Sequence, residues 1–142
     1  MPIRSAKAQW MGNLEQGKGT VKLGSGAYEG AYSFGSRFEE GKGTNPEEMI
    51  AAAHAGCYSM AFSAELSKAG HVPKSVTTTA KVELRKDDSG PRISLITLEC
   101  EAIVPGIDQV QFMTIAQGAK VGCPISKALA SVEIKLQAKL VN

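Results

Sequence analysis

A long helix that is apolar on nearly every side is the feature that most constrains this chain. Asn45 and Pro46 form a strong helix start, because Asn caps free backbone N–H groups and Pro suits the first helical position. The helix is predicted to run to about Ala69, before Gly70, and so to span about 24 residues or roughly 36 Å. After Glu48 the polar face disappears. A helix of this kind must be buried, so the rest of the chain has to fold around it.

Length and composition narrow the class of protein. The 142 residues can bury a sizeable core, and we expect residues 1–142 to form a single domain. Sixteen basic and fourteen acidic residues are scattered, without the basic stripe typical of nucleic-acid binding. The first residues lack the apolar segment of a signal peptide, and no apolar run is long enough to cross a membrane. We therefore expect a cytoplasmic protein that binds neither nucleic acid nor membranes.

Outside the long helix, some segments show the two-residue apolar periodicity of strands and others show the periodicity of helices. Two long segments with period-two alternation, joined by an Asp- and Gly-rich turn, predict an antiparallel hairpin. Strands with one polar face beside an apolar helix predict an α+β fold, with antiparallel sheets wrapped around a long buried central helix. Strands are predicted at 5–11, 20–23, about 76–85, about 92–104 and 132–140, and the region 27–38 can hold another. Further helices are predicted at 108–121 and 124–130.

The apolar circumference of the long helix also predicts a partner chain. One curved sheet covers one side of a helix, whereas this helix is apolar on all sides. We expect a second copy of the chain to cover the remainder, with the two helices packed across a two-fold axis in an obligate homodimer. A folded monomer at micromolar concentration in gel filtration would contradict this expectation.

The three cysteines differ in their surroundings, and without a Cys-x-x-Cys motif they are too few for a disulfide scaffold. Cys100 lies on the apolar face of a predicted strand and is interpreted as a core residue. Cys123 precedes Pro124 at a helix start, where the dipole favours a thiolate, although a small residue at a helix junction is an equally good interpretation. Cys57 lies mid-helix, one turn after His54, and is either a small core residue or a reactive thiol.

A reactive Cys57 would need a cation, because burial in apolar surroundings raises the pKa of a thiol. Arg37, shortly before the helix, is the candidate cation, and Glu47 is well placed to hold its planar guanidinium. Glu47 and Cys57 are ten residues apart, which is about 15 Å along a continuous helix. They cannot share a site within one chain but can meet across an antiparallel helix pair. Glu47 can also serve simply as a helix cap.

The two histidines do not predict a metal site. His54 either tunes the Cys57 thiol or is a hydrogen-bonded core residue, and we favour the second interpretation. His71 follows Gly70 in a loop and is most simply a surface residue. The two histidines with Cys57 and Cys123 show no recognised ligand spacing, so neither a metal nor another cofactor is predicted.

Five segments distributed along the chain place two cysteines in extended motifs. They are residues 37–39, 43–48, 52–57, 104–108 and 119–126. In this order they resemble the OsmC/Ohr family of thiol peroxidases, and specifically its osmotically inducible OsmC branch. The resemblance implies an OsmC-like fold in an intertwined homodimer with two interface sites. It implies that Cys57 is the peroxidatic and Cys123 the resolving cysteine, supported by Arg37 and Glu47. The residues alone rank Cys123 as the more acidic thiol, whereas the family assigns the attack to Cys57.

The family resemblance also implies a reaction. Organic hydroperoxides, and hydrogen peroxide less well, would oxidise Cys57 to a sulfenic acid, which would condense with Cys123 to a disulfide. An external dithiol, of the lipoyl type in the family, would reduce the disulfide again. Such an enzyme would defend the cell against oxidative and osmotic stress. Candidate apolar walls of the substrate site are Phe38, Met49, Met60 and Phe62.

Three other functions remain open from the sequence. A non-enzymatic dimer that binds a small ligand would carry its cysteines incidentally. A redox sensor would form the same disulfide without efficient turnover. A hydrolase would pair Cys57 with His54, although no third orienting group is evident.

Overall fold

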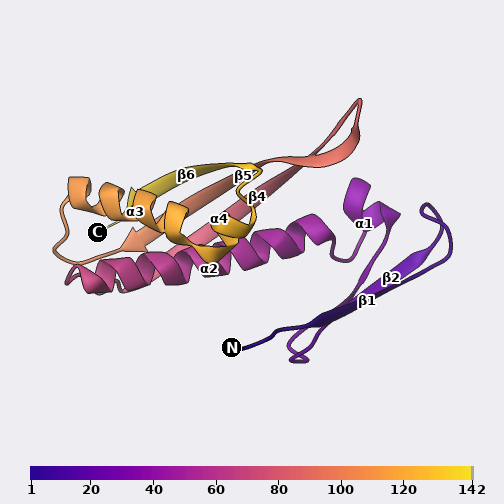
Figure 1. Ribbon diagram of the computed structural model, residues 1–142, viewed down its shortest axis with the longest axis horizontal. Helices are drawn as coiled ribbons and strands as arrows, with labels where there is room; N and C mark the ends of the chain where they lie inside the picture. The colour runs from indigo at the N-terminus through magenta and orange to yellow at the C-terminus, as the bar shows by residue number, and fades with distance from the viewer. Residues whose placement is uncertain (142) are drawn as a thin grey trace. The chain divides into compact units, whose positions relative to one another are not determined.

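Two three-stranded sheets and four helices make up residues 1–141, which are the residues described by the structure, a computed structural model (Figure 1). The residue contacts divide the chain into two compact units. Unit 1 comprises Met1–Met49, and unit 2 comprises the residues from Ile50 onward. This mixture of helices and strands confirms the predicted α+β class.

Unit 1 is a small antiparallel sheet followed by a short helix. The strands pair in the order β1-β2-β3, and Trp10 on β1 packs against Tyr32 at a ring distance of 5.3 Å. The region 27–38 holds a strand, as predicted, and its second half is helical. Ser33 and Ser36 form a reciprocal capping box there, and this local bonding prevails over the aromatic alternation. The elements are β1 (Ala6–Met11), β2 (Lys18–Leu23), β3 (Glu29–Tyr32) and α1 (Phe34–Phe38).

The long helix α2 (Pro46–Lys68) begins and ends where the sequence predicts. The Asn45 side chain accepts a hydrogen bond of 2.7 Å from the backbone N–H of Glu48 at the first turn. Gly70 has a φ of +89°, the left-handed conformation that ends a helix. Among the described residues, no helix combines the length and the apolar character needed to cross a membrane.

Only part of the apolar surface of α2 is covered within the chain. Tyr58, Phe62 and Leu66 are fully buried, whereas Met60 is 76% exposed. The exposed alanine, glycine and methionine positions recur every three or four residues and therefore form one stripe along the helix. They are Ala52, Ala53, Gly56, Met60 and Ala64. This stripe is the kind of surface for which the sequence predicts a second copy of the chain.

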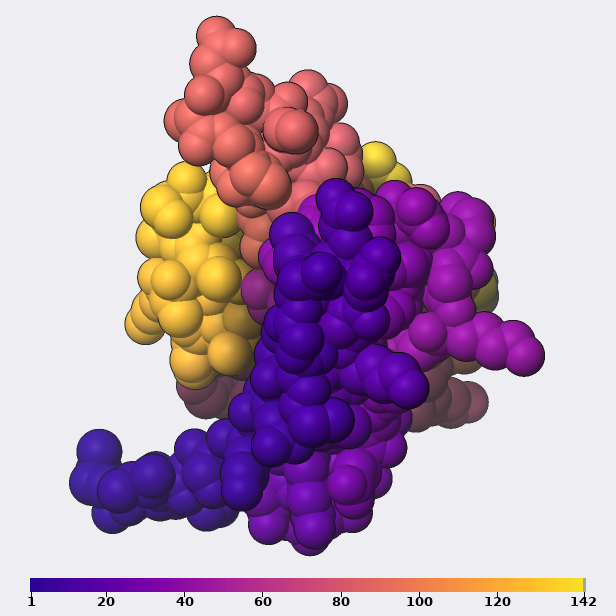
Figure 2. Space-filling model, turned by 90° about the vertical axis from the view of Figure 1, so that its right-hand side faces the viewer, coloured from indigo at the N-terminus to yellow at the C-terminus, as the bar shows by residue number. Residues whose placement is uncertain are grey.

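Unit 2 contains the predicted hairpin, β4 (Ser75–Asp87) and β5 (Gly90–Ile103), whose tip projects from the rest of the unit (Figures 1 and 2). The last strand, β6 (Glu133–Leu140), completes the sheet in the order β4-β5-β6. It runs parallel to β5, so the prediction of purely antiparallel sheets is wrong here. Helices α3 (Gln109–Gly122) and α4 (Pro124–Ala128) return the chain to the start of the sheet, which makes a parallel partner possible.

The core of unit 2 joins β5 to the helices. Ile96, Leu98 and Cys100 on the inner face of β5 are at most 1% exposed, which confirms the interpretation of Cys100 as a core residue. Phe62 on α2 packs against Phe112 on α3 at a ring distance of 5.3 Å in the same cluster. Phe62 is therefore a core residue, and its prediction as a wall of the substrate site is wrong. This packing fixes α2 and α3 relative to each other within unit 2.

Candidate active site

Two cysteines that are 66 positions apart in the sequence meet in unit 2. Cys57 Sγ on α2 lies 2.8 Å from Cys123 Sγ, and both residues are free thiols. Cys57 is partly exposed, whereas Cys123 is completely buried. The two sulfurs are in contact and are farther apart than the length of a disulfide bond, about 2.05 Å.

The backbone of Cys123 is held at the junction of two helices. Its N–H donates to the carbonyl of Ala119 at the end of α3, at 3.0 Å. Its carbonyl accepts from the N–H of Lys127 in α4, also at 3.0 Å. On the facing helix, the Tyr58 hydroxyl next to Cys57 donates to the carbonyl of Ala116 at 3.1 Å. These bonds hold α2, α3 and α4 together at the level of the cysteine pair.

The two thiols differ in acidity. Burial raises the pKa of Cys57, and the neighbouring Cys123 raises it further. Burial also disfavours a Cys123 thiolate, but hydrogen bonds from the Cys57 thiol, from Ser126 and from the Ile125 backbone outweigh it and lower the pKa of Cys123. The sequence prediction that Cys123 is the more acidic thiol is thus confirmed within unit 2. A thiolate on Cys57 requires an additional positive charge.

His54 lies on α2 in unit 2, one helical turn before Cys57. It is completely buried, and its Nε2 lies 2.8 Å from the Ser126 hydroxyl on α4. Burial lowers the pKa of the imidazole, so the ring is neutral. Its Nδ1 is buried without a hydrogen-bond partner in residues 1–141. The interpretation of His54 as a hydrogen-bonded core residue is confirmed.

The second predicted pair, Arg37 and Glu47, lies in unit 1. Arg37 Nη2 is 2.8 Å from Glu47 Oε1, and Arg37 Nε is 3.1 and 3.2 Å from Oε1 and Oε2. The Ser36 hydroxyl donates to the Thr44 carbonyl at 2.7 Å, and the Asn45 amide donates to the Ser36 carbonyl at 3.0 Å. These two bonds tie α1 to the start of α2. Glu47 therefore orients the guanidinium, as the sequence predicts.

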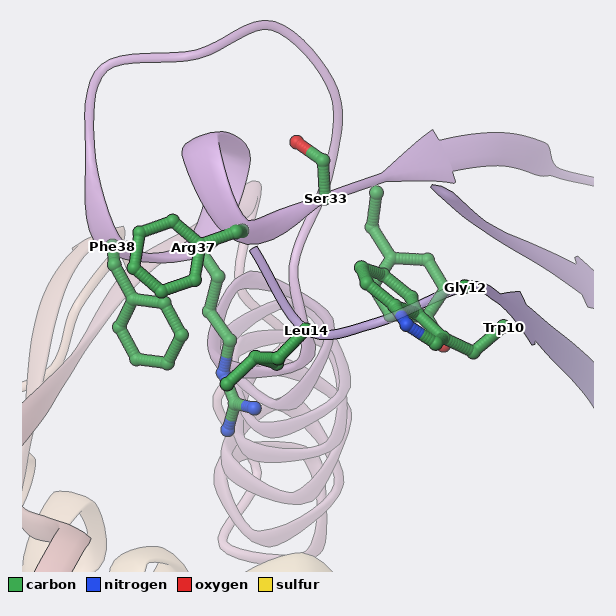
Figure 3. Close-up of a pocket in the computed structure, with 8 residues that line it drawn as sticks. Trp10, Gly12, Leu14, Ser33, Arg37 and Phe38 are labelled. Carbon is green, nitrogen blue, oxygen red and sulfur yellow. The ribbon is translucent and has the colours of Figure 1, made fainter. Parts of the chain in front are cut away.

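A cavity of about 400 Å³ in unit 1 is lined by Arg37 and by mainly apolar side chains (Figure 3). The guanidinium carbon lies 5.2 Å from the centre of the Phe38 ring, and Phe38, a predicted wall of the substrate site, lines this cavity. Trp10 and Leu14 were not predicted here, because they come from β1 and the loop after it. The lining residues are Trp10, Gly12, Leu14, Tyr32, Ser33, Phe34, Arg37 and Phe38.

The structure thus shows the predicted site residues as two pairs, one in each unit. Cys57 and Cys123 are two thiols in contact, and Arg37 with Glu47 provides an oriented positive charge. Across the described part of the chain, no three His, Cys, Asp or Glu side chains are grouped so that they could hold a metal ion. The arrangement is suited to thiol chemistry.

Comparison with known proteins places the chain in a family. Residues 39–137 match the family model of OsmC-like protein. The chain is 49% identical to Peroxiredoxin OsmC of Escherichia coli K12 over 138 residues, or 96% of each chain. It is 30% identical to Organic hydroperoxide resistance protein-like 1 of Staphylococcus epidermidis over 107 residues, 72% of this chain and 74% of the relative.

Solved structures agree with this assignment. The organic hydroperoxide resistance protein OhrB of Bacillus subtilis superposes with a TM-score of 0.74 at 25% identity, covering 95% of this chain and 98% of that one. The OsmC-like protein VCA0330 of Vibrio cholerae gives a TM-score of 0.77 at 18% identity, with coverage of 97% and 99%, and so shares the fold. The OsmC-like fold is confirmed, and the chain belongs to the OsmC-like protein family.

Proposed function

We propose that this protein is a thiol-dependent peroxidase that reduces organic hydroperoxides through Cys57 and Cys123. The observation that carries the proposal is the distance of 2.8 Å between the two sulfurs, one partly exposed and one buried. The names of its relatives, a peroxiredoxin and organic hydroperoxide resistance proteins, support the same reaction class.

Cys57 attacks the peroxide, because this residue is partly exposed whereas Cys123 is completely buried. The thiolate forms an S–O bond with the distal oxygen, and the O–O bond breaks. The departing alkoxide takes up a proton to become an alcohol, and Cys57 is left as a sulfenic acid. A guanidinium beside the sulfur favours the thiolate and neutralises charge on the departing oxygen.

Cys123 then resolves the oxidised enzyme. Its thiolate attacks the Cys57 sulfur, forms the S–S bond and displaces hydroxide, which is protonated to water. Thiol–disulfide exchange with an external dithiol, of the lipoyl type, returns both cysteines to thiols and leaves the reductant as a disulfide. The short distance between the sulfurs makes this condensation faster than further oxidation of Cys57.

The cavity in unit 1 supports an organic substrate. Its walls are aromatic and aliphatic, and Arg37 is the charged residue among those that line it. An alkyl or aryl group gains free energy by leaving water for such walls, whereas hydrogen peroxide has no group to bury. Cumene hydroperoxide should therefore react with a higher catalytic efficiency than hydrogen peroxide. Equal efficiencies would contradict this part of the proposal.

The active form is a homodimer in which Arg37 and Glu47 of one protomer serve Cys57 of the other. Glu47 and Cys57 are ten positions apart in the sequence. That is about 15 Å along a continuous helix, which supports a site shared between two protomers. The exposed apolar stripe on α2, which includes Gly56 and Met60, supports helix packing between two copies. The cation that Cys57 lacks within unit 2 would then come from the partner.

The decisive experiment follows the oxidation state of each cysteine. Wild type, Cys57→Ser and Cys123→Ser are assayed for consumption of cumene hydroperoxide with a dithiol, and intact masses are measured after one equivalent of oxidant. Cys57→Ser should be inactive, and Cys123→Ser should stop at a sulfenic or over-oxidised Cys57. Cys100→Ala is the matched control, because it alters a core cysteine and keeps the pair. A wild type that consumes no peroxide and forms no Cys57–Cys123 disulfide would refute the proposal.

A further inference from the structure

Four aromatic rings line the cavity of unit 1, and they form two pairs. The ring centroids of Trp10 and Tyr32 are 5.3 Å apart at an interplanar angle of 53°, and those of Phe34 and Phe38 are 5.0 Å apart at 50°. Tilted pairs at separations of about 4.5–7 Å are a geometry that aromatic rings prefer. The second pair lies beside the cation, because the Arg37 guanidinium contacts the Phe38 ring. Figure 3 shows Trp10 on the opposite side of the cavity from Arg37 and Phe38.

The Trp10–Tyr32 pair is held across all three strands of the unit 1 sheet. Gly19 on the middle strand β2 pairs with Trp10 on β1 and with Tyr32 on β3. A Cβ on Gly19 would lie 2.6 Å from Cε3 of Trp10 and closer still to the Tyr32 ring, so the two rings can meet only over a glycine. The indole N–H of Trp10 donates to the Asn13 carbonyl at 3.1 Å, which fixes the orientation of its ring. This end of the cavity is therefore a preformed aromatic surface.

The four rings are left partly open rather than packed in a core. All are partly exposed, and Phe38 reaches 41%. The cavity beside them has a volume of about 400 Å³, within the range of roughly 300–1,000 Å³ typical of sites for small molecules. A cross-strand aromatic pair stabilises a sheet without a cavity beside it, so the cavity needs a separate explanation. An apolar ligand that covered these rings would remove their surface from water.

The position of Arg37 sets the direction in which a substrate lies. In the proposed reaction the guanidinium neutralises charge on the departing oxygen, so the peroxide group has to lie at the Arg37 end of the cavity. The organic group then extends toward Trp10 and Tyr32. An aromatic ring on the substrate can make an edge-to-face or offset contact with these rings, which an aliphatic group of the same size cannot make.

We propose that Trp10 is a specificity-determining residue, which together with Tyr32 binds the aromatic ring of aryl hydroperoxides. The inference deepens the proposed function, on which it rests, by naming aryl-substituted hydroperoxides as the preferred class of organic substrate. The contact involves the organic group and not the reacting oxygens. The alcohol product therefore makes the same contact as the hydroperoxide, and Trp10 takes no part in the bond changes at sulfur.

The test compares two ligands that differ only in the saturation of one ring. They are cumyl alcohol, which is the product formed from cumene hydroperoxide, and the analogue in which cyclohexyl replaces phenyl. Their affinities for the reduced protein are measured by ligand-observed NMR, which requires no peroxide chemistry. Trp10 is the only tryptophan of the chain, so a change in tryptophan fluorescence on addition of cumyl alcohol reports binding at this residue.

The quantity that matters is the ratio of the affinity for the phenyl ligand to the affinity for the cyclohexyl ligand. Aromatic contacts change an affinity by roughly twofold to tenfold beyond the effect of area burial. We expect the ratio to fall about fivefold in Trp10→Leu and to be largely kept in Trp10→Phe, which restores a ring. It should also fall in Gly19→Ala, whose methyl group forces the two rings apart. Tyr28→Leu is the matched control, because this aromatic residue is 42% exposed and is not among those that line the cavity.

The same selectivity should appear in catalysis. The ratio of kcat/KM for cumene hydroperoxide to that for its cyclohexyl analogue should fall about fivefold in Trp10→Leu, through KM rather than kcat. Circular dichroism establishes that each variant is folded. No binding of either alcohol to the wild type, or an unchanged affinity ratio in folded Trp10→Leu and Gly19→Ala, would overturn the inference. Failure of the proposed function would appear separately, as a wild type that consumes no peroxide but still binds the phenyl ligand through Trp10.

Discussion

Replacing Glu47 by Gln should show how much of the Arg37–Glu47 pair serves stability and how much serves chemistry. Both carboxylate oxygens of Glu47 contact the guanidinium, with distances of 2.8, 3.1 and 3.2 Å to Nη2 and Nε of Arg37. A glutamine keeps one acceptor oxygen, removes the negative charge and turns an amide N–H2 toward the guanidinium. The change therefore removes one charged hydrogen bond and adds a donor facing a donor.

The expected loss of stability is modest. A hydrogen bond to a charged group contributes about 1.5–3 kcal/mol when it is shielded from solvent. Here the Glu47 side chain is 10% exposed, but the Arg37 side chain is 36% exposed, so water screens the pair. We therefore expect a loss of about 1 kcal/mol. For a chain of this size that corresponds to a fall of about 3 °C in melting temperature.

The assay is a double-mutant cycle of Glu47→Gln and Arg37→Met, measured by urea unfolding at one fixed protein concentration. The coupling free energy should be about 1 kcal/mol. The matched control is the exposed pair Glu65–Lys68 on the same helix, 2.7 Å apart, whose coupling should be smaller. A coupling no larger than that of the control would refute the reasoning about stability.

The chemical effect should exceed the effect on stability. Because Glu47 orients the guanidinium, its loss misplaces the cation that the Cys57 thiolate needs, and we expect a fall of roughly tenfold or more in the rate of Cys57 oxidation. A loss of about 1 kcal/mol leaves nearly all of the protein folded. A Glu47→Gln variant that is destabilised but oxidises Cys57 at the wild-type rate would therefore contradict the proposed role of the pair.

Three further predictions concern pH and assembly. Burial lowers the pKa of His54 below 6.5, so the unfolded chain takes up the histidine proton before the folded chain does as the pH falls. Stability relative to His54→Gln should therefore be greatest above about pH 6.5 and should shrink toward pH 5. A difference in the free energy of urea unfolding that stays constant with pH would contradict this. Hydrogen bonds from Ser89 lower the pKa of Asp87 to about 2. The contribution of this carboxylate to stability is therefore present above the unfolded pKa of 3.8 and is lost as the pH falls through about 2. A midpoint near 3.8 for this carboxyl in an NMR titration would refute the prediction. Met60→Glu places a charge on the exposed stripe of α2 and should shift the gel-filtration elution volume toward that of a monomer. The control Val110→Glu, at a residue of α3 that is 77% exposed, should not shift it. Equal elution volumes for the two variants would contradict the dimer.

Local signals allowed much of the fold to be predicted. The start of α2 was predictable because Asn45 accepts from a free N–H group and Pro46 has no N–H to satisfy, and its end because Gly70 adopts a positive φ. The β4–β5 hairpin was predictable because alternation requires only neighbouring residues. The short helix α1 was not predicted, because a capping box of two serines prevails there over a weak alternation.

The sequence by itself predicted most of the elements, the family and the candidate reactive residues, since these depend on residue types and short spacings. The tertiary structure alone decided that β6 runs parallel to β5, that Phe62 lies in the core, and that Trp10 lines the cavity. It also decided that His54 meets Ser126, 72 positions away, and that Cys57 meets Cys123. Such contacts depend on the return path of the chain and on which helix faces pack together, and spacing along a sequence carries no measure of either.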